Sequence, residues 1–259
     1  PTVLQALRSG SSIRLPEIPN SPELRLTRET AGNEAEIGGV SVRIQEPEMC
    51  PRFVGVTIRG VKVEASPEWL QNRLRSLGQQ PINNIVDATN YVMLETGRPI
   101  HGYDADKLQG TIVVRRATEG EQLTTLDGTR RTMSAEDLVV TDDSGPIGLG
   151  GVMGGESTEI SETTTRVLVE SAHWDAVSMF RTGRRHKITS EAGKRNERGV
   201  DPTICEAAAD RVVELLTTYG GATAEPGVTV VGTPPAQPHV SMATDLPARV
   251  SGLPIDTDT

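Results

Sequence analysis

Short polar side chains and one histidine are concentrated in residues 83–104. In 83–95 the apolar residues recur at helical spacing, and the same stretch carries Asn83, Asn84, Asp87, Thr89 and Asn90. Such groups are costly to bury without hydrogen-bond partners, and a solvated helix face does not need so many of them. A Gly-Arg-Pro turn then leads to His101. We therefore expect this segment to hold something polar.

Glycines dominate residues 148–155, where five of eight positions are glycine. The segment departs from the dinucleotide-binding fingerprint because Met153 occupies the position of the third glycine. Closely spaced glycines let a backbone approach a ligand and present bare N–H groups as donors. A tight hairpin in a crowded sheet has the same composition, so both interpretations stand.

An alternating segment at 166–171 contains a carboxylate. The alternation predicts a strand with Leu168 and Glu170 on one face and Val167 and Val169 on the other. Glu170 then lies either at the exposed end of the strand or in a pocket. His101 is likewise either structural or catalytic, and the pattern alone leaves both roles open.

Residues 181–198 hold seven basic and two acidic side chains, whereas the whole chain has a formal net charge of −9. The overall charge argues against non-specific nucleic-acid binding by the entire surface. The local excess is typical of a patch that faces phosphates, and also of a solvated basic loop.

Several classes of protein are excluded. The sequence has no GxSxG, HExxH or phosphate-binding-loop motif. Cys50 and Cys205 are far apart and the chain has four histidines, so we predict no metal site, no disulfide framework and a reducing cytoplasmic location. With no long apolar run and no signal-peptide pattern at the N-terminus, we predict no membrane association.

The elements that must position these residues are helices and strands in mixed order. Ser66, as N-cap, and Pro67 begin a predicted helix at 66–78. Two more helices are predicted at 83–95 and 201–221, and Asp127-Gly128 predicts a type I′ hairpin. Predicted strands lie in 40–63, 111–116, 138–155, 166–171 and 227–232. This order predicts an α+β fold: a layered, mixed-sheet domain with helices packed on it.

Five segments in sequence order resemble the β subunit of bacterial phenylalanyl-tRNA synthetase. They are 83–108, the TLDGTRR turn at 125–131, 148–160, 167–174 and 184–202. The match runs from about residue 50 to residue 221 and centres on the editing domain of that family. The resemblance implies an editing domain at 31–239, a remnant of a split N-terminal domain at 1–30, and the truncated start of a following domain at 240–259.

The resemblance also implies an activity. The family's editing domain hydrolyses tyrosine wrongly esterified to tRNA(Phe), and its aminoacylation site lies on the α subunit. The expected assembly is a cytoplasmic α2β2 heterotetramer that binds tRNA(Phe). No cofactor is expected in this segment, and the complete synthetase uses Mg²⁺ and ATP.

Residue by residue, the resemblance implies three sets. Catalytic residues that hold the water or the terminal ribose would be His101, Thr89 and Asn90. The substrate pocket would be completed by Glu170, Gly151, Ser190 and Ala192, with Glu170 accepting the phenol O–H. The tRNA would be contacted by Arg184, Arg185, Lys187, Arg195 and Arg198. Two questions stay open: whether His101 is a general base, and how far the arginines contact phosphate or brace the pocket through ion pairs.

The chain departs from the family pattern at three places. Ser190 stands where threonine is usual, Gly102-Tyr103 where alanine-phenylalanine is usual, and Asn196 where an aromatic residue is common. None of these removes His101 or Glu170. Two alternatives remain: a non-catalytic tRNA-binding and assembly module with an idle pocket, and a freestanding protein that edits in trans.

Overall fold

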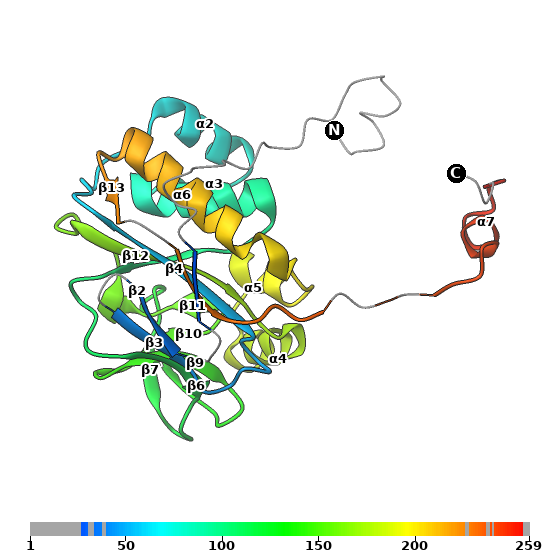
Figure 1. Ribbon diagram of the computed structural model, residues 1–259, viewed down its shortest axis with the longest axis horizontal. Helices are drawn as coiled ribbons and strands as arrows, with labels where there is room; N and C mark the ends of the chain where they lie inside the picture. The colour runs from blue at the N-terminus through cyan, green and yellow to red at the C-terminus, as the bar shows by residue number, and fades with distance from the viewer. Residues whose placement is uncertain are drawn as a thin grey trace.

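Two six-stranded sheets form the body of the protein (Figure 1). The computed structural model describes residues 27–30, 34–37, 40–225, 228–236, 239 and 241–255. Helices cover the outer face of one sheet, and the second sheet packs against its other face. The predicted α+β class is confirmed.

The central sheet lies between the helices and the second sheet. Its strands are β1 (Thr27–Thr30), β4 (Arg52–Arg59), β5 (His101–Asp104), β12 (Arg166–His173), β13 (Thr223–Ala224) and β14 (Val228–Gly232). The order is β1-β14-β4-β12-β5, and β13 also pairs with β4. β1 is parallel to β14, whereas β4 is antiparallel to β12 and β14, and β12 to β5.

The outer sheet has the order β11-β10-β9-β6-β3-β2. Its strands are β2 (Glu34–Ile37), β3 (Val40–Ile44), β6 (Ile112–Arg116), β9 (Leu138–Asp142), β10 (Gly145–Leu149) and β11 (Met153–Gly154). A separate hairpin joins β7 (Gln122–Thr124) to β8 (Arg130–Thr132). The glycine-rich segment is the connection from β10 to β11, so it lies at the edge of this sheet.

The helices form two groups and one isolated member. They are α2 (Glu68–Ser76), α3 (Asn84–Thr96), α4 (Ala176–His186), α5 (Glu191–Asn196), α6 (Cys205–Tyr219) and α7 (Leu246–Ser251), with short 3₁₀ turns η1 (Glu156–Thr158) and η2 (Pro202–Ile204). α2, α3 and α6 cover the central sheet, α4 and α5 lie together beside the sheets, and α7 stands apart (Figure 1).

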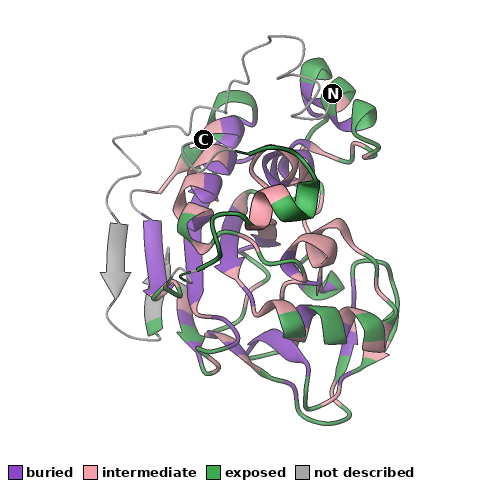
Figure 2. Cartoon of the chain, turned by 90° about the vertical axis from the view of Figure 1, so that its right-hand side faces the viewer, coloured by how far each residue is buried: buried purple, intermediate pink, exposed green. Residues whose placement is uncertain are grey.

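Each face of the central sheet has its own hydrophobic core. Leu168 contributes to the core between the two sheets, while Val167 and Val169 contribute to the core under α3 and α6. The predicted alternation of this strand is therefore confirmed. β4 and β12 are buried on both faces, as their β-branched composition favours (Figure 2).

Two local predictions are wrong in detail: the N-cap of the first predicted helix and the type of the hairpin turn. Ser66 is not the N-cap of α2, because Pro67 occupies that position. The Ser66 hydroxyl instead donates to Asp87 Oδ2 at 2.6 Å. The hairpin at Asp127-Gly128 forms, but only Gly128 has a positive φ, of 73°, so the turn is not type I′, which needs positive φ at both residues. Asp127 instead accepts from Thr129 N at 3.1 Å and Thr125 Oγ1 at 2.6 Å.

The expected domain boundaries remain predictions. Residues 1–26 of the expected N-terminal remnant lie outside the described residues. Thr27–Thr30, which was also assigned to that remnant, is built into the central sheet as β1.

Candidate functional site

β5 and β12 bring the candidate histidine and carboxylate to one face of the central sheet. Glu170 is directly opposite His101 in the antiparallel register, and Leu168 is opposite Tyr103. Directly paired residues point to the same face, which places all four side chains toward the outer sheet. The strand pattern left Glu170 either at an exposed strand end or in a pocket, and its exposed fraction of 6 % shows that the side chain is buried.

Glu170 is a buried carboxyl with one hydrogen-bond donor among the described residues. Tyr103 Oη donates to Glu170 Oε2 at 2.5 Å. Burial raises the pKa of Glu170 to about 7, although the Tyr103 hydrogen bond acts in the opposite direction. The carboxyl therefore changes charge close to neutral pH.

His101 is held as a neutral imidazole. Burial lowers its pKa to about 4, so the ring is uncharged at neutral pH. Its Nε2 is buried and has no hydrogen-bond partner among the described residues. The ring stands edge-on to the Tyr103 ring, with centroids 4.3 Å apart. A neutral imidazole with an unused nitrogen can accept a proton or orient a water molecule.

Two cavities meet at His101. The inner cavity, of about 80 Å³, is lined by Tyr103, Glu170, Trp174, Asn196 and the glycine-rich connection. The outer cavity, of about 430 Å³, is lined by Thr89 and Asn90 of α3, by Leu126 and by Ser190. Residues that line both are Ile100, His101, Val152, Met153, Gly154 and Ala192. All seven residues predicted to be catalytic or substrate-binding therefore line one cavity or the other.

The glycine-rich connection is packed tightly against the site. Gly151 has φ of +66°, and a Cβ there would lie 2.7 Å from Trp174 Cγ. Its carbonyl accepts from Asn196 Nδ2 at 2.7 Å. The N–H groups of Gly150 and Val152 donate to backbone carbonyls, whereas the N–H of Gly151 has no acceptor among the described residues. A small backbone donor is thus available beside the inner cavity.

Ser190 ties α5 to this connection. It is the N-cap of α5, since its Oγ accepts from Gly193 N at 2.9 Å. The same hydroxyl donates to Val152 O at 2.6 Å. Its hydrogen-bonding groups are therefore engaged in positioning the loop.

Most of the polar side chains at the start of α3 have structural partners. Asn83 caps the helix, and Asn84 donates to Lys62 O at 2.8 Å. Asp87 accepts from Ser66 and from Ile82 N at 2.8 Å. The Thr89 hydroxyl donates to Val86 O at 2.9 Å. Of the groups expected to surround a ligand, Asn83, Thr89 and Asn90 line the outer cavity, whereas Asn84 and Asp87 do not.

The predicted tRNA-binding residues fall into two groups. Arg184, Lys187 and Arg198 are exposed, and Arg184 lies over the Phe180 ring at 4.9 Å. Arg195 pairs with Glu191 at 2.7 Å, and Arg185 pairs with both Glu136 and Asp137. These residues belong to α4, to α5 and to the turns that follow them, and neither helix was predicted from the sequence.

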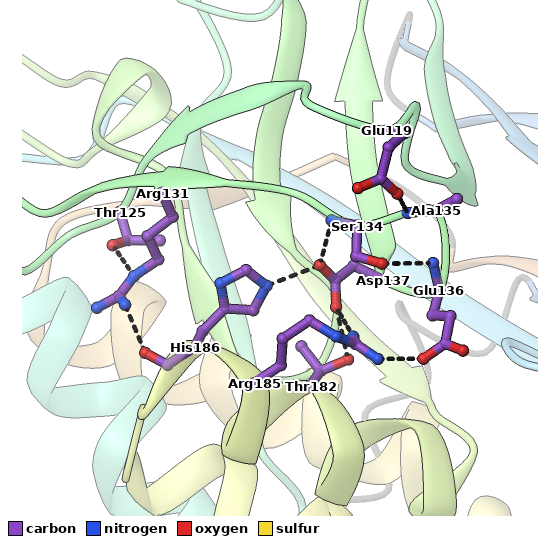
Figure 3. Close-up of polar contacts among 10 residues, drawn as sticks. All are labelled: Glu119, Thr125, Arg131, Ser134, Ala135, Glu136, Asp137, Thr182, Arg185 and His186. Atoms are coloured by element: carbon purple, nitrogen blue, oxygen red, sulfur yellow. Dashed lines mark hydrogen bonds and ion pairs between the residues drawn. The ribbon is translucent and has the colours of Figure 1, made fainter.

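A buried carboxylate network anchors α4 and has no signal in the sequence (Figure 3). Asp137 is fully buried and binds Arg185 and the Nε2 of His186, the latter at 2.7 Å. Ser134 N also donates to Asp137, at 2.9 Å. Burial raises the pKa of Asp137, but His186, the Ser134 amide and Arg185 together hold it below its ordinary value.

The described residues offer neither a cluster of metal ligands nor a membrane-spanning helix. Within those ranges, no group of three or more His, Cys, Asp and Glu side chains is placed to hold a metal ion. The same part of the chain contains no helix that is both long and apolar enough to cross a bilayer.

Gly154 offers a test of the contact between the loop and His101. Its φ is not in the left-handed region, but a Cβ there would lie 2.8 Å from His101 Nε2 and closer still to Cε1. We expect Gly154→Ala to lower the free energy of unfolding by about 1–3 kcal/mol, because an added methyl overpacks a buried contact. Urea unfolding measures this change.

Gly183→Ala is the matched control for Gly154→Ala. A Cβ at Gly183 of α4 meets nothing closer than Ile188 O at 3.4 Å, and alanine favours a helix. We expect this variant to be as stable as the unmodified chain or slightly more stable. Equal unfolding midpoints for the two variants would contradict the packing described for Gly154.

The chain is similar to a known domain family and to curated proteins of one kind. A family model described as the B3/4 domain matches residues 49–221. The chain is 54 % identical over 225 residues to a phenylalanine–tRNA ligase β subunit of Streptomyces avermitilis, covering 85 % of this chain and 27 % of that protein. It is 49 % identical to the phenylalanine–tRNA ligase β subunit of Cutibacterium acnes, and this match covers 86 % of this chain and 26 % of that protein. The chain thus spans about a quarter of the length of these curated relatives.

A solved structure is also similar, but weakly. It is an N-terminal fragment of the phenylalanyl-tRNA synthetase β-subunit from Pyrococcus horikoshii, with a TM-score of 0.46 and 14 % identity. The likeness covers 87 % of this chain and 62 % of that one. A similarity of this size is too low to define the fold, which stands on the strands and helices described above.

Proposed function

The chain belongs to the B3/4 domain family, and from this premise we propose that it is the tRNA-editing part of a phenylalanine–tRNA ligase β subunit. It hydrolyses tyrosine wrongly esterified to tRNA(Phe). The observation that carries the proposal is the register of β5 and β12: the buried Glu170 of the inner cavity lies beside the neutral His101, which lines both cavities.

Glu170 supplies the specificity. A synthetic pocket shaped for phenylalanine penalises an added hydroxyl only about 100-fold, so tyrosine is accepted too often. A second site can instead bind that hydroxyl. Glu170 accepts the phenol O–H, and a phenylalanyl ring leaves the buried carboxylate without this partner. Sites of this kind discriminate by roughly 10⁴ or more.

Hydrolysis adds water to the ester carbonyl and breaks the acyl–oxygen bond, which releases tyrosine and restores the ribose hydroxyl. The ester is already activated, so positioning of the water matters more than a strong nucleophile. His101 orients the water from between the cavities, and Thr89 and Asn90 contact the terminal ribose in the outer cavity. The N–H of Gly151 stabilises the developing oxyanion.

The RNA approaches over α4 and α5. Arg184, Lys187 and Arg198 are exposed and contact phosphates. Arg185 and Arg195 act mainly as braces, because each already has a carboxylate partner. In the complete synthetase the β subunit joins an α subunit in a cytoplasmic α2β2 heterotetramer, which uses ATP and Mg²⁺ at the aminoacylation site.

Deacylation of matched esters tests the proposal. Tyrosyl-tRNA(Phe) and phenylalanyl-tRNA(Phe) are incubated with the chain, alone and within an assembled synthetase whose aminoacylation step is blocked by omission of ATP. We expect rapid loss of tyrosine only. Binding of both RNAs with hydrolysis of neither, in the assembled enzyme, would instead support a tRNA-binding and assembly module.

A further inference from the structure

A phenol from the protein itself already contacts the carboxyl that is proposed to recognise a ligand. Tyr103 Oη lies 2.5 Å from Glu170 Oε2, and the exposed fractions of the two residues are 2 % and 6 %. Both residues line the inner cavity. The edge-on packing of the His101 ring further confines the Tyr103 ring. The contact is therefore a fixed part of the site.

The two oxygens of Glu170 are not equivalent. Oε2 accepts from Tyr103, whereas Oε1 accepts no hydrogen bond from the described residues. The Glu170 side chain lines the inner cavity, and Oε1 is its oxygen without a donor among those residues. An ionised carboxylate has free lone pairs on both oxygens. The oxygen that remains for a ligand hydroxyl is thus Oε1.

The charged state of Glu170 depends on few neighbours. The titratable groups that face it are Tyr103 and His101 on β5 and the Cys50 thiol before β4. His101 is neutral, and burial raises the pKa of Cys50 well above its ordinary value, so that thiol is neutral too. Asn196 and Trp174, from α5 and the end of β12, line the cavity without charge. Tyr103 is therefore the group that favours the carboxylate anion.

We propose that Tyr103 is a positioning residue that sets the specificity of the cavity: its phenol stabilises the anionic form of Glu170 and directs Oε1 to the hydroxyl of the ligand. The proposal rests on the proposed function and names the residue through which Glu170 acts. An anionic acceptor makes a stronger hydrogen bond than a neutral carboxyl. It also makes a phenylalanyl ring more costly, because the ring leaves a buried charge without its second partner.

The size of the effect follows from the charge balance. With Tyr103 present, the pKa of Glu170 is about 7, so the anion predominates slightly above neutral pH. Removing a hydrogen bond to the charged form raises a carboxyl pKa, here by about one unit or more. Tyr103→Phe removes only the hydroxyl. The variant should therefore discriminate poorly at neutral pH and recover its discrimination in more alkaline solution.

Binding of non-hydrolysable probes tests this inference. The probes are amide-linked tyrosyl-adenosine and phenylalanyl-adenosine, in which nitrogen replaces the ester oxygen. Their affinities for the full chain are measured by calorimetry from about pH 6 to about pH 9, a range that brackets the pKa values concerned. We expect the preference for the tyrosyl probe to fall about fivefold in Tyr103→Phe at neutral pH, because a shift of about one unit from a pKa of about 7 lowers the anionic fraction from about one half to about one tenth. Its midpoint should move up by about one pH unit.

Tyr91→Phe is the matched control. Tyr91 also donates to a glutamate, Glu95, at 3.1 Å, but it does so on α3 outside both cavities. This variant should keep the wild-type preference and its midpoint. If Tyr103→Phe prefers the tyrosyl probe as strongly as the unmodified chain, with the same pH midpoint, Tyr103 has no positioning role. Tighter binding of that probe would show that Tyr103 competes with the ligand, and this also overturns the inference.

A second measurement separates this inference from the proposed function. The infrared carboxyl band of Glu170, identified by its loss in Glu170→Gln, is titrated without ligand. An upward shift of its midpoint in Tyr103→Phe supports the Tyr103 contact even where neither probe binds, in which case only the proposed function fails. An unchanged midpoint overturns the role of Tyr103 while leaving the deacylation test of the proposed function intact.

Discussion

Glu170→Ala is expected to reduce the preference for tyrosyl over phenylalanyl esters about 10³-fold, from roughly 10⁴ to roughly tenfold. The reason is the burial of the carboxyl together with its contact with the inner cavity. Without it, the cavity loses the carboxyl acceptor that is proposed to bind the phenol hydroxyl. This loss corresponds to about 4 kcal/mol of differential transition-state binding. The ratio of the two kcat/KM values for deacylation measures it.

The pH dependence of this preference has a definite sign. Because burial raises the pKa of Glu170 to about 7, the carboxylate predominates above that pH and is protonated below it. The preference for the tyrosyl ester should therefore weaken as the pH falls through about 7 and strengthen as it rises. Glu170→Ala should show no such dependence.

Asp210 provides a matched control for the Glu170 prediction. Burial raises its pKa to about 7 as well, with a further contribution from Glu206, but it lies on α6 and lines neither cavity. Asp210→Asn should leave the ratio of the two rates unchanged. Retention of the full preference in Glu170→Ala would rule out recognition of the hydroxyl by this carboxylate.

Asp137→Ala is expected to lower the free energy of unfolding by about 3–5 kcal/mol. The carboxylate is fully buried, and its removal leaves Arg185 and His186 without their shared acceptor (Figure 3). Chemical denaturation at neutral pH measures the loss. Since the pKa of Asp137 is held below its ordinary value, its contribution is present at neutral pH and is lost as the pH falls below about 4.

Glu136→Ala is the control for the Asp137 prediction because it removes the other partner of the same arginine. The Glu136 side chain is 70 % exposed, and exposed ion pairs contribute less than about 1 kcal/mol. We expect a small change at most. Equal destabilisation by the two variants would show that the buried network does not anchor α4.

The sequence predicts the strand face and the helix on which functional side chains lie where a local pattern determines them. The alternation of 166–171 assigns Glu170 to the same face as Leu168, and the structure confirms this. The helix at 83–95 differs from α3 by one residue at each end, because Asn83 is a strong N-cap and Gly97 ends the helix with a φ of 81°. Such signals act within a few residues.

Contacts between distant segments could not be predicted in this way. Asp137 reads as one of several loop carboxylates until α4 brings Arg185 and His186 to it. The basic stretch has the same composition whether its arginines are free or paired. In the structure, Arg185 forms an ion pair with Asp137, and Arg195 forms one with Glu191. Nothing local connects Tyr103 with Glu170, since they are 67 positions apart and meet only through strand register.

The parallel pairing of Thr27–Thr30 with β14 bears on how this polypeptide can be shortened. A version that begins at residue 31 would lack β1, one of the two strands that pair with β14. The main-chain groups of Val228–Gly232 would then face solvent on that side. An open, apolar strand edge recruits further strands, so the truncated protein would self-associate. Retaining residues from Thr27 onward keeps that edge covered.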